Sequence, residues 1–265
     1  GYKWDKANGT CVIHNNTNSN VAAEINNGYN KILGRGNKTG GAVDNSIIAG
    51  EGNRFEGQNK NVFVSGNKNL VKSGVFNSAI VSGDDNCLSN DVNNSSIVSG
   101  VGAISIRDNE TVIGGFYVDG LLGNSVAQPF TCQTSQFMMQ LSLNNTTTLT
   151  SLNTANGNAF INVNANSFID VTANCTATGD SLSKFSSGTL TGKISVGSNG
   201  IPALQVSTYT HKSDNAANPF GDHTFYLSTS GSQMSIRTQG ITSERAIFTA
   251  SVTLTEVIHD PTIIL

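Results

Sequence analysis

A short apolar phrase that ends in glycine recurs between about residues 30 and 115. Each copy places three or four apolar, small or β-branched residues before the glycine. The marking glycines are Gly34, Gly50, Gly66, Gly83, Gly100 and Gly114 or Gly115. Their spacing is 16, 16, 17, 17 and then 14 or 15 residues. Self-similarity at a short, nearly fixed period indicates a structural repeat in which each copy stacks on the next.

An asparagine follows three residues after each of the first four glycines. These asparagines are Asn37, Asn53, Asn69 and Asn86. After Gly100 the rule fails, because Ala103 stands at that position. Glycine adopts positive φ without steric penalty, and asparagine tolerates it better than most residues, so the pair can serve a turn. Alternatively, the asparagine side chains form a hydrogen-bonded ladder along the stack. The sequence leaves both interpretations open.

The repeats predict stacked short strands, because glycine and asparagine interrupt the apolar runs too often for helices. A second apolar position recurs after each asparagine, at Phe55, Leu70 with Val71, Leu88, and Ile104 with Ile106. Two small apolar clusters per coil do not enclose a dry interior of much size. We therefore expect a flat roll with one apolar face exposed, and such a face usually marks an interface. Cyclic self-association of identical chains covers it most simply.

The rhythm Ser-x-Ile-x-Gly-x-x-Asn, as in residues 46–53, resembles the head repeats of YadA-type trimeric adhesins. Similar repeats occur in phage and large-virus fibres and tailspikes. The resemblance covers about residues 28–120. It implies a homotrimer of stacked β-roll or β-helix coils. The repeats here are slightly longer, and Phe55 and Phe63 stand where family members often carry alanine or valine.

After residue 115 the pattern changes to longer strands with strict alternation. In the last of these, Ala246, Phe248, Ala250, Val252 and Leu254 share one face, with small polar residues between them. Several such segments separated by turn residues predict an antiparallel β-sandwich of jelly-roll type. We therefore expect an all-β chain in three parts. These are a lead-in or cap over residues 1–27, a repeat shaft over 28–120, and a head over 121–265. Trp4 is expected to pack against the first rung, with stacking on a sugar as the alternative.

The composition is typical of an all-β extracellular or virion protein with many turns. Of the 265 residues, 37% are hydrophobic and only 12% are charged, with 28 glycines and 4 prolines. The net charge of −3 and the lack of a basic run disfavour nucleic-acid binding. No apolar stretch has membrane-spanning length, so we expect no membrane insertion. No signal peptide is recognisable at Gly1, which favours a virion protein or a piece of a longer chain.

The four cysteines are widely spaced and form no metal-binding motif. They are Cys11, Cys87, Cys132 and Cys175. We expect free thiols, which suits assembly in a reducing compartment. A disulfide between Cys132 and Cys175 remains an alternative.

The sequence offers little that predicts catalysis, and we expect a non-enzymatic protein without a cofactor. It has no nucleophile elbow and no phosphate-binding loop. Acidic residues that could pair for glycoside cleavage stand at the turn corners of the repeats: Glu51, Glu56, Asp84, Asp85, Asp91 and Asp108. Acids at such corners are usually solvated, and we interpret them so.

A long segment over residues 210–223 is the candidate binding loop, since long loops in compact domains are often functional. The candidate ligand-binding residues combine aromatic rings and amides, as sugar sites do: Tyr209, His211, Asn215, Asn218, Phe220 and His223. Two other interpretations remain. His211, Asp214, Asp222 and His223 can converge on a metal, although we expect none. The segment can also be a plain surface loop with Phe220 in the core.

Together these features favour a homotrimeric viral fibre or spike, most simply of a phage, on the virion surface. Its head is expected to bind a host-surface glycan or protein, while its N-terminus contacts other virion proteins. Three alternatives from other classes stay open. These are a bacterial trimeric adhesin, a fibre-borne polysaccharide depolymerase, and a purely structural spacer of the virion.

Overall fold

The computed structural model describes residues 2–5, 10–13, 30–115, 117–118, 130–144, 148–179, 185–214, 224–239 and 245–259. All regular elements in this part are strands, which confirms the all-β class. None of the described residues forms a helix long and apolar enough to cross a membrane. Strands β1 (Tyr2–Asp5) and β2 (Thr10–Ile13) form an antiparallel hairpin. The capping role of residues 1–27, and of Trp4 in particular, stays a prediction.

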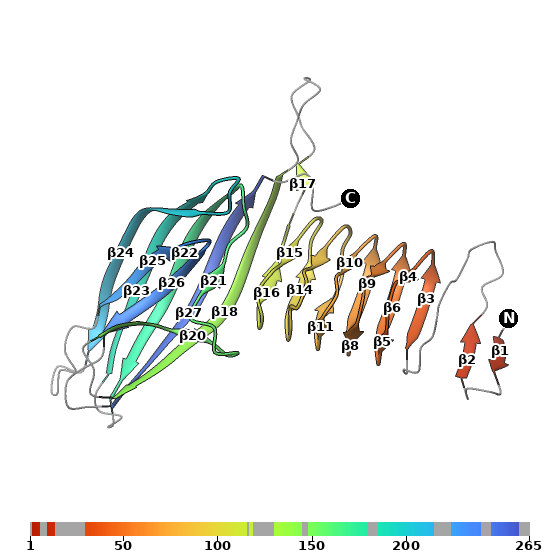
Figure 1. Cartoon of the computed structure of the whole chain (residues 1–265), viewed down its shortest axis with the longest axis horizontal. Helices are drawn as coiled ribbons and strands as arrows, with labels where there is room; N and C mark the ends of the chain where they lie inside the picture. The colour runs from red at the N-terminus through yellow and green to blue at the C-terminus, as the bar shows by residue number, and fades with distance from the viewer. Residues whose placement is uncertain are drawn as a thin grey trace, which may run out of the picture.

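The repeats form a β-solenoid of about five turns whose rungs lie one behind another along the long axis (Figure 1). Each full turn has three sides, and each side is a parallel sheet. The first side contains β3 (Lys31–Arg35), β6 (Ile47–Glu51), β9 (Phe63–Asn67), β12 (Ala79–Ile80), β14 (Ser96–Ser99) and β16 (Thr111–Ile113). The second contains β4 (Lys38–Thr39), β7 (Arg54–Phe55), β10 (Leu70–Val71), β13 (Cys87–Leu88) and β15 (Ile104–Ser105). The third contains β5 (Val43–Asp44), β8 (Asn59–Lys60) and β11 (Val75–Phe76).

The marking glycines stack directly on one another at the first corner of each turn. All have positive φ, from +104° at Gly34 to +148° at Gly100. A Cβ added to Gly50 would lie 1.9 Å from the carbonyl oxygen of Gly66, so no other residue fits this column without moving the backbone. Two independent demands, a left-handed backbone and the close approach of the next rung, therefore explain why glycine recurs at this period.

The recurring asparagines form a buried side-chain ladder. Asn53 donates through Nδ2 to Oδ1 of Asn37 (3.0 Å), and its own Oδ1 accepts from the backbone N–H of Asn69 (3.0 Å). The same Nδ2 also donates to the backbone oxygen of Gly66 (2.8 Å). None of the four asparagines has positive φ. Of the two interpretations that the sequence allowed, the structure shows the ladder, and only the glycine serves the left-handed turn.

The coil closes around its own interior, which corrects the expectation of a flat roll. Apolar residues of all three sides are buried together in one continuous core. Its third side is supplied by one residue per turn, including Val43, Val75 and Val92. These valines stand singly rather than in an apolar run of three or four, and Asn59 takes the equivalent place in one turn. The sequence pattern therefore hid the third side. A coil closed in this way has no open interior face that partner chains would have to cover.

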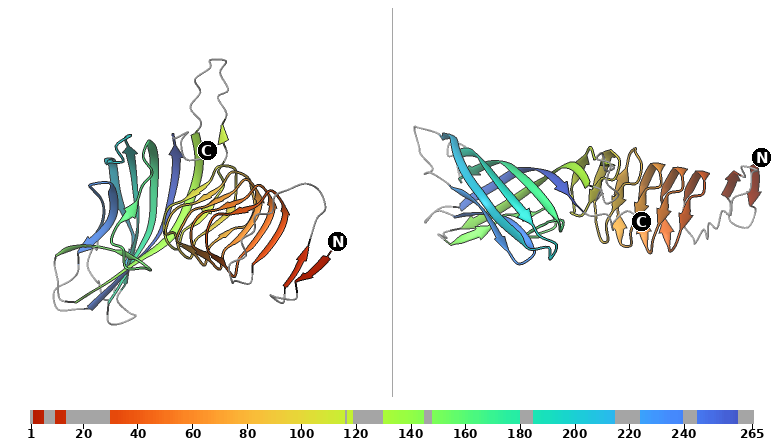
Figure 2. Two further views of the ribbon diagram at one scale, coloured as in Figure 1. Left: turned by 45° about the vertical axis from the view of Figure 1, so that its right-hand side comes forward. Right: turned by 90° about the horizontal axis from the view of Figure 1, so that it is seen from above.

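Beyond the solenoid, five long strands extend the first side of the shaft. They are β18 (Phe130–Asn144), β22 (Ser167–Thr178), β23 (Phe185–Val196), β24 (Pro202–Asp214) and β27 (Arg245–Ile258). Strand β16 pairs with β18 in antiparallel register, so a single sheet of 13 strands runs through both regions in the order β24-β23-β22-β27-β18-β16-β14-β12-β9-β6-β3. The two short strands β17 (Tyr117–Val118) and β20 (Asn153–Thr154) also pair with β18. Figure 2 shows the shaft and the long strands as two parts of this sheet.

A second sheet covers one face of the long strands. It comprises β19 (Leu149–Ser151), β21 (Ile161–Asn162), β25 (Phe225–Ser230) and β26 (Gln233–Gln239). Side chains of both sheets share one apolar core, whose largest members include Phe225 and Phe248. The covered face is the same face that lines the solenoid, because Val112 is in register with Ser135 and Ser135 with Leu254. A separate jelly-roll sandwich and the boundary near residue 120 stay predictions.

The cysteines in the described part are free thiols. Cys87 lies inside the shaft and Cys175 inside the head, and both are buried, while Cys132 is half-buried. The alternative disulfide between Cys132 and Cys175 is not formed. Cys11 lies outside the described side chains.

Candidate functional site

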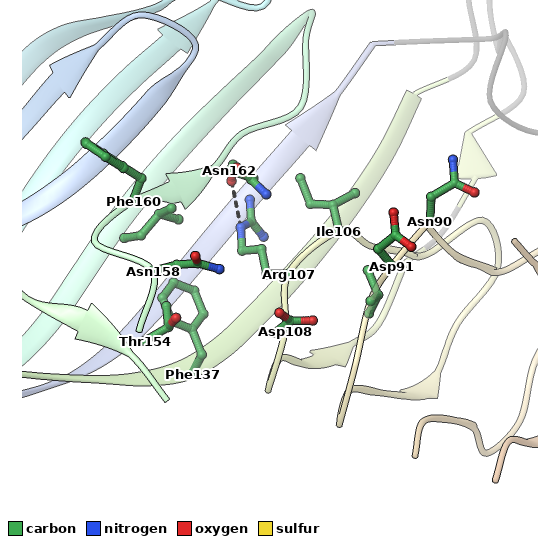
Figure 3. A pocket seen from close by; sticks show the side chains of 12 residues that line it. Asn90, Asp91, Ile106, Arg107, Asp108, Phe137, Thr154, Asn158, Phe160 and Asn162 are labelled. Atoms are coloured by element: carbon green, nitrogen blue, oxygen red, sulfur yellow. Dashed lines mark hydrogen bonds between the residues drawn. The ribbon is translucent and has the colours of Figure 1, made fainter. Parts of the chain in front are cut away.

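A pocket of about 270 Å³ lies where the last turns of the shaft meet the head (Figure 3). Its shaft wall consists of Asn90, Asp91, Val92, Ile106, Arg107 and Asp108. Its head wall consists of Phe137, Thr154, Asn158, Phe160, Ile161 and Asn162. The two walls are brought together by the pairing of β16 with β18, so segments at least 29 residues apart in the sequence share one site.

The head wall offers an aromatic ring beside amide groups. Phe160 is 44% exposed, which leaves part of its ring available at the pocket. Asn158 and Asn162 are exposed next to it, and Figure 3 shows all three on the head side. Thr154 contributes a buried hydroxyl that has no hydrogen-bond partner among the described residues. An apolar ring face with adjacent donors and acceptors is the chemistry that holds a sugar ring.

The shaft wall offers two carboxylates from consecutive turn corners. Asp108 is held in place, because Oδ1 accepts from the Asn93 backbone N–H (2.6 Å) and Oδ2 from Nδ2 of Asn156 (2.7 Å). Asp91 is exposed, and no hydrogen bond among the described residues engages its carboxylate. Its Oδ1 would lie 2.1 Å from a Cβ at position 74, so Gly74 makes room for it. From the sequence, these two acids were interpreted as solvated corner residues. The structure shows that both face a pocket.

Behind the pocket a buried charge network joins the shaft to the head. Arg107 donates to Glu256 of β27 through both terminal nitrogens, at 2.7 and 3.2 Å, and it also pairs with Glu110. Its Nε donates to the backbone oxygen of Asn162 (2.7 Å), which is part of the head wall (Figure 3). Arg107, Glu110 and Glu256 are all buried. The guanidinium therefore fixes both walls relative to each other.

The carboxylates of this network are fully occupied. Glu256 also accepts from Nε2 of Gln133 (3.1 Å), and Glu110 from the Ser105 hydroxyl (2.9 Å) and the Ile106 backbone N–H (3.1 Å). Burial alone would lower the pKa of Arg107, but Glu256 and Glu110 outweigh burial and raise that pKa above its ordinary value. A charged guanidinium that is bidentate to one carboxylate and bonded to a second is a rigid structural element rather than a free ligand group.

The candidate residues from the predicted binding loop are not brought together at this pocket. Tyr209 is half-buried with its ring 5.6 Å from that of Phe225, and burial raises its pKa to about 12. His211 is exposed, and its Nε2 lies 3.1 Å from the Ser186 hydroxyl. The loop boundary is corrected, because β24 continues to Asp214 and residues 210–214 are strand. Asn215, Asn218, Phe220, Asp222 and His223 lie outside the described residues, and their binding role stays a prediction.

The pocket residues of the head gave a weak sequence signal. Phe160 and Asn158 lie in a segment that alternates like an ordinary strand, so nothing marked Phe160 as exposed. Glu256 gave a better one, since it continues the inward-facing positions of the last strand after Leu254. A charged residue at an inward position indicates a buried partner, and Arg107 is that partner.

Comparisons with known proteins give only distant likenesses. No protein-family model matches the chain, and no curated protein sequence matches it. Among solved structures, it is similar to the tailspike protein gp49 of Acinetobacter baumannii bacteriophage Fri1, a capsular polysaccharide depolymerase. The identity is 10% and the TM-score 0.29, with 83% of this chain and 48% of that chain covered.

Two other phage tailspikes show similar values. For Acinetobacter baumannii phage AM24 the identity is 10%, the TM-score 0.23, and the coverage 82% of this chain and 56% of that one. For Acinetobacter phage vB_ApiP_P1 the identity is 8%, the TM-score 0.20, and the coverage 86% of this chain and 49% of that one. The chain thus spans about half the length of the tailspikes it matches. YadA-type adhesin heads are not shown as relatives.

The expectation that the protein is not an enzyme is corrected by this comparison. The Fri1 tailspike is a capsular polysaccharide depolymerase, and depolymerases are enzymes, so the non-enzymatic prediction is withdrawn. At these TM-scores the likeness transfers no activity to this chain, and the case for its function rests on its own repeats and pocket.

Proposed function

We propose that the protein is a fibre or spike of a virion, most simply of a phage, that attaches to a host surface by binding a saccharide in the junction pocket. Two features support this proposal. The shaft is a slender β-solenoid with the repeat rhythm of fibres and adhesins, and it leads to a broad two-layered head. The structural spacer shares the shaft but does not require a ligand pocket.

The observation that carries the proposal is the composition of the pocket. A partly exposed phenylalanine, three asparagines and two carboxylates converge on one cavity. Sugars present an apolar ring face and a rim of hydroxyls, which fit an aromatic ring and amide or carboxylate groups respectively. A cavity of about 270 Å³ suits one or two sugar units of a longer chain rather than a large ligand.

A second candidate function is cleavage of the bound saccharide. Asp91 and Asp108 stand on the same wall, and paired carboxylates are the groups that most glycosidases use as acid and as base or nucleophile. This hypothesis is distinguished from attachment by new reducing ends in the bound polysaccharide. Loss of those ends in Asp108→Asn with retained binding supports cleavage, whereas binding without reducing ends leaves attachment alone.

We propose further that three chains associate along the shaft. The outer surface of the first side carries large apolar residues that are each 38–46% exposed, Ile47 and Phe63 in one column and Val81, Val98 and Ile113 two positions further along the rungs. Exposed large apolar residues on successive rungs are typical of a surface that another chain covers. The mass of the chain in solution, measured by light scattering, tests this. A monomer would contradict the trimer without affecting the pocket.

The saccharide proposal is tested by an array of bacterial surface polysaccharide fragments probed with the full chain. Binding that Phe160→Ala reduces at least about tenfold is expected, since stacking on an aromatic ring contributes strongly to sugar affinity. Tyr226→Ala is the matched control, because Tyr226 is 45% exposed and does not line the pocket. Equal loss in both variants, or no binding by the wild type, contradicts the proposal.

A further inference from the structure

The charges around the pocket are unbalanced. Asp91 and Asp108 line the shaft wall, and the only cationic side chain among the lining residues is Arg107. That guanidinium is already shared by two buried carboxylates, Glu110 and Glu256. Four carboxylates at and behind the pocket therefore share one guanidinium charge, and the pocket presents negative charge to whatever enters it.

The neutral groups of the pocket do not offset this charge. Asn90, Asn158 and Asn162 offer amide donors and acceptors, and Phe160 offers an apolar ring whose face is itself the negative end of the aromatic quadrupole. Figure 3 shows Asp91 and Asp108 on the shaft side, opposite Asn158, Asn162 and Phe160. A hydroxyl or amine that enters between the walls finds acceptors on the shaft side, whereas a second anion finds no unshared cation among the lining residues.

We infer that the pocket selects saccharide units without acidic groups, that is, neutral or amino-bearing sugars, and rejects uronic, sialic and phosphorylated ones. This inference rests on the proposed saccharide function and specifies its ligand class. The rejecting elements are the Asp91 and Asp108 carboxylates, because like charges placed close together disfavour the wrong partner.

The test uses the full chain on an array that holds neutral, amino-bearing and uronic-acid fragments of bacterial surface polysaccharides. Wild-type protein is expected to bind fragments of the first two kinds in a Phe160-dependent manner. Asp91→Asn, which keeps the shape of the side chain, is expected to raise binding of acidic fragments about tenfold. Asp170→Asn is the control, because Asp170 is an equally exposed carboxylate on the head sheet that pairs with Lys193 and does not line the pocket.

The outcomes separate the two proposals. Phe160-dependent binding of acidic fragments by the wild type overturns the ligand class and leaves the saccharide function standing. Absence of any binding overturns the saccharide function itself. Rejection of acidic fragments that Asp91→Asn and Asp108→Asn both leave unchanged overturns the electrostatic cause. Binding of acidic fragments that rises between about 0.05 M and about 0.5 M salt supports the inference, since salt screens the repulsion between like charges, and weak binding that salt leaves unchanged overturns the electrostatic cause.

Discussion

The shaft and the head are built from the same sheet but are stabilised differently. In the shaft each rung contacts only its two neighbours, and the interior contains polar columns of asparagine and serine next to the apolar ones. In the head, residues from nine strands contribute to two layers around one apolar core. Stability of the shaft is therefore a sum of local contacts between rungs, as in other solenoids, whereas the head is expected to unfold as one unit.

The difference is greatest where the two regions meet. Both the shaft core and the head core are mainly apolar, but the junction between them contains the buried network of Arg107, Glu110 and Glu256. A buried ion network does not by itself stabilise more than apolar packing, yet it tolerates only one arrangement of its partners. It thereby fixes the angle and register at which the local and the cooperative region join, and with them the geometry of the pocket.

Loss of the junction arginine is expected to have the largest effect. Arg107→Leu leaves Glu110 and Glu256 buried without their cation, which should cost about 3–5 kcal/mol of unfolding free energy. Chemical denaturation with hydrogen exchange on both regions measures the effect. The triple variant Arg107→Leu, Glu110→Gln, Glu256→Gln is the comparison, and it should recover part of the loss. A variant as stable as the wild type contradicts the role of the network.

The glycine column is expected to be the most sensitive part of the shaft. Gly50→Ala places a methyl group 1.9 Å from the Gly66 carbonyl oxygen at φ +113°, so a cost of about 2–4 kcal/mol is expected from strain and forced separation of rungs. Gly200→Ala is the control, with φ +72° but nothing within 4 Å of the added methyl. It should cost only about 1 kcal/mol. Equal costs would show that backbone conformation alone selects glycine.

Alkaline pH should weaken both regions through their buried thiols, and the head more. Burial raises the pKa of Cys87 in the shaft from 9.0 to about 11 and that of Cys175 in the head from 9.0 to about 12. In the unfolded chain both thiols ionise near pH 9, so stability is complete below that pH and falls as pH rises toward the folded pKa. A loss of about 3 kcal/mol for Cys87 and about 4 kcal/mol for Cys175 is expected by then, since one pKa unit corresponds to about 1.4 kcal/mol. Cys175→Ala should flatten the decline in the head; an unchanged slope contradicts the assignment.

One rung of the asparagine ladder should contribute less than a glycine contact. Asn53→Ala leaves the Gly66 carbonyl and the Asn69 amide without their buried partner, at a cost of about 1–3 kcal/mol. Asn61→Gly serves as the control. It removes an exposed rung, the bond from Asn61 Nδ2 to Asn77 Oδ1, while glycine retains the left-handed backbone. The control should change stability by about 0.5 kcal/mol or less, as surface substitutions usually do. Hydrogen exchange should show the Asn53 effect in neighbouring rungs before the head.

The pocket phenylalanine is expected to have the smallest effect on folding. Phe160→Ala should change the unfolding free energy by about 0.5 kcal/mol or less, because the side chain is 44% exposed and surface positions contribute little. The same variant is expected to lose saccharide binding. A thermal melt performed beside the array measurement checks this separation, and a large drop in melting temperature would mean that the ring belongs to the core.

The sequence was informative wherever one physical demand repeats at a fixed spacing. The glycine column and the alternation of the last strand each predicted a feature that the structure shows, because each arises from local geometry. The third side of the coil was missed because it depends on one valine per turn, too sparse for a pattern. The pairing of β16 with β18 was missed because it joins two regions of different sequence pattern. The change of pattern after residue 115 was interpreted as a domain boundary.

The candidate site was less predictable than the fold. Asp91 and Asp108 were recognisable as acids at turn corners. The pocket that they face is completed by head residues that follow later in the sequence, so the sequence pattern did not show it. Phe160 looks like any inward residue of a strand until its neighbours are known. The predicted loop was chosen for its length and composition, which indicate function only in general, and most of its candidate residues lie outside the described part of the chain.

The stacking of rungs along the long axis has a mechanical consequence. Backbone hydrogen bonds between rungs point along that axis, as does the pairing of β16 with β18 that carries the first side into the head. Tension between the N-terminal end of the shaft and a ligand-bound head therefore acts on the hydrogen bonds of all three sides of a rung at once. Under such tension we expect the hydrogen bonds between two rungs to break together and the turns to unfold one after another. The shaft should therefore withstand a short force and lengthen under a sustained one.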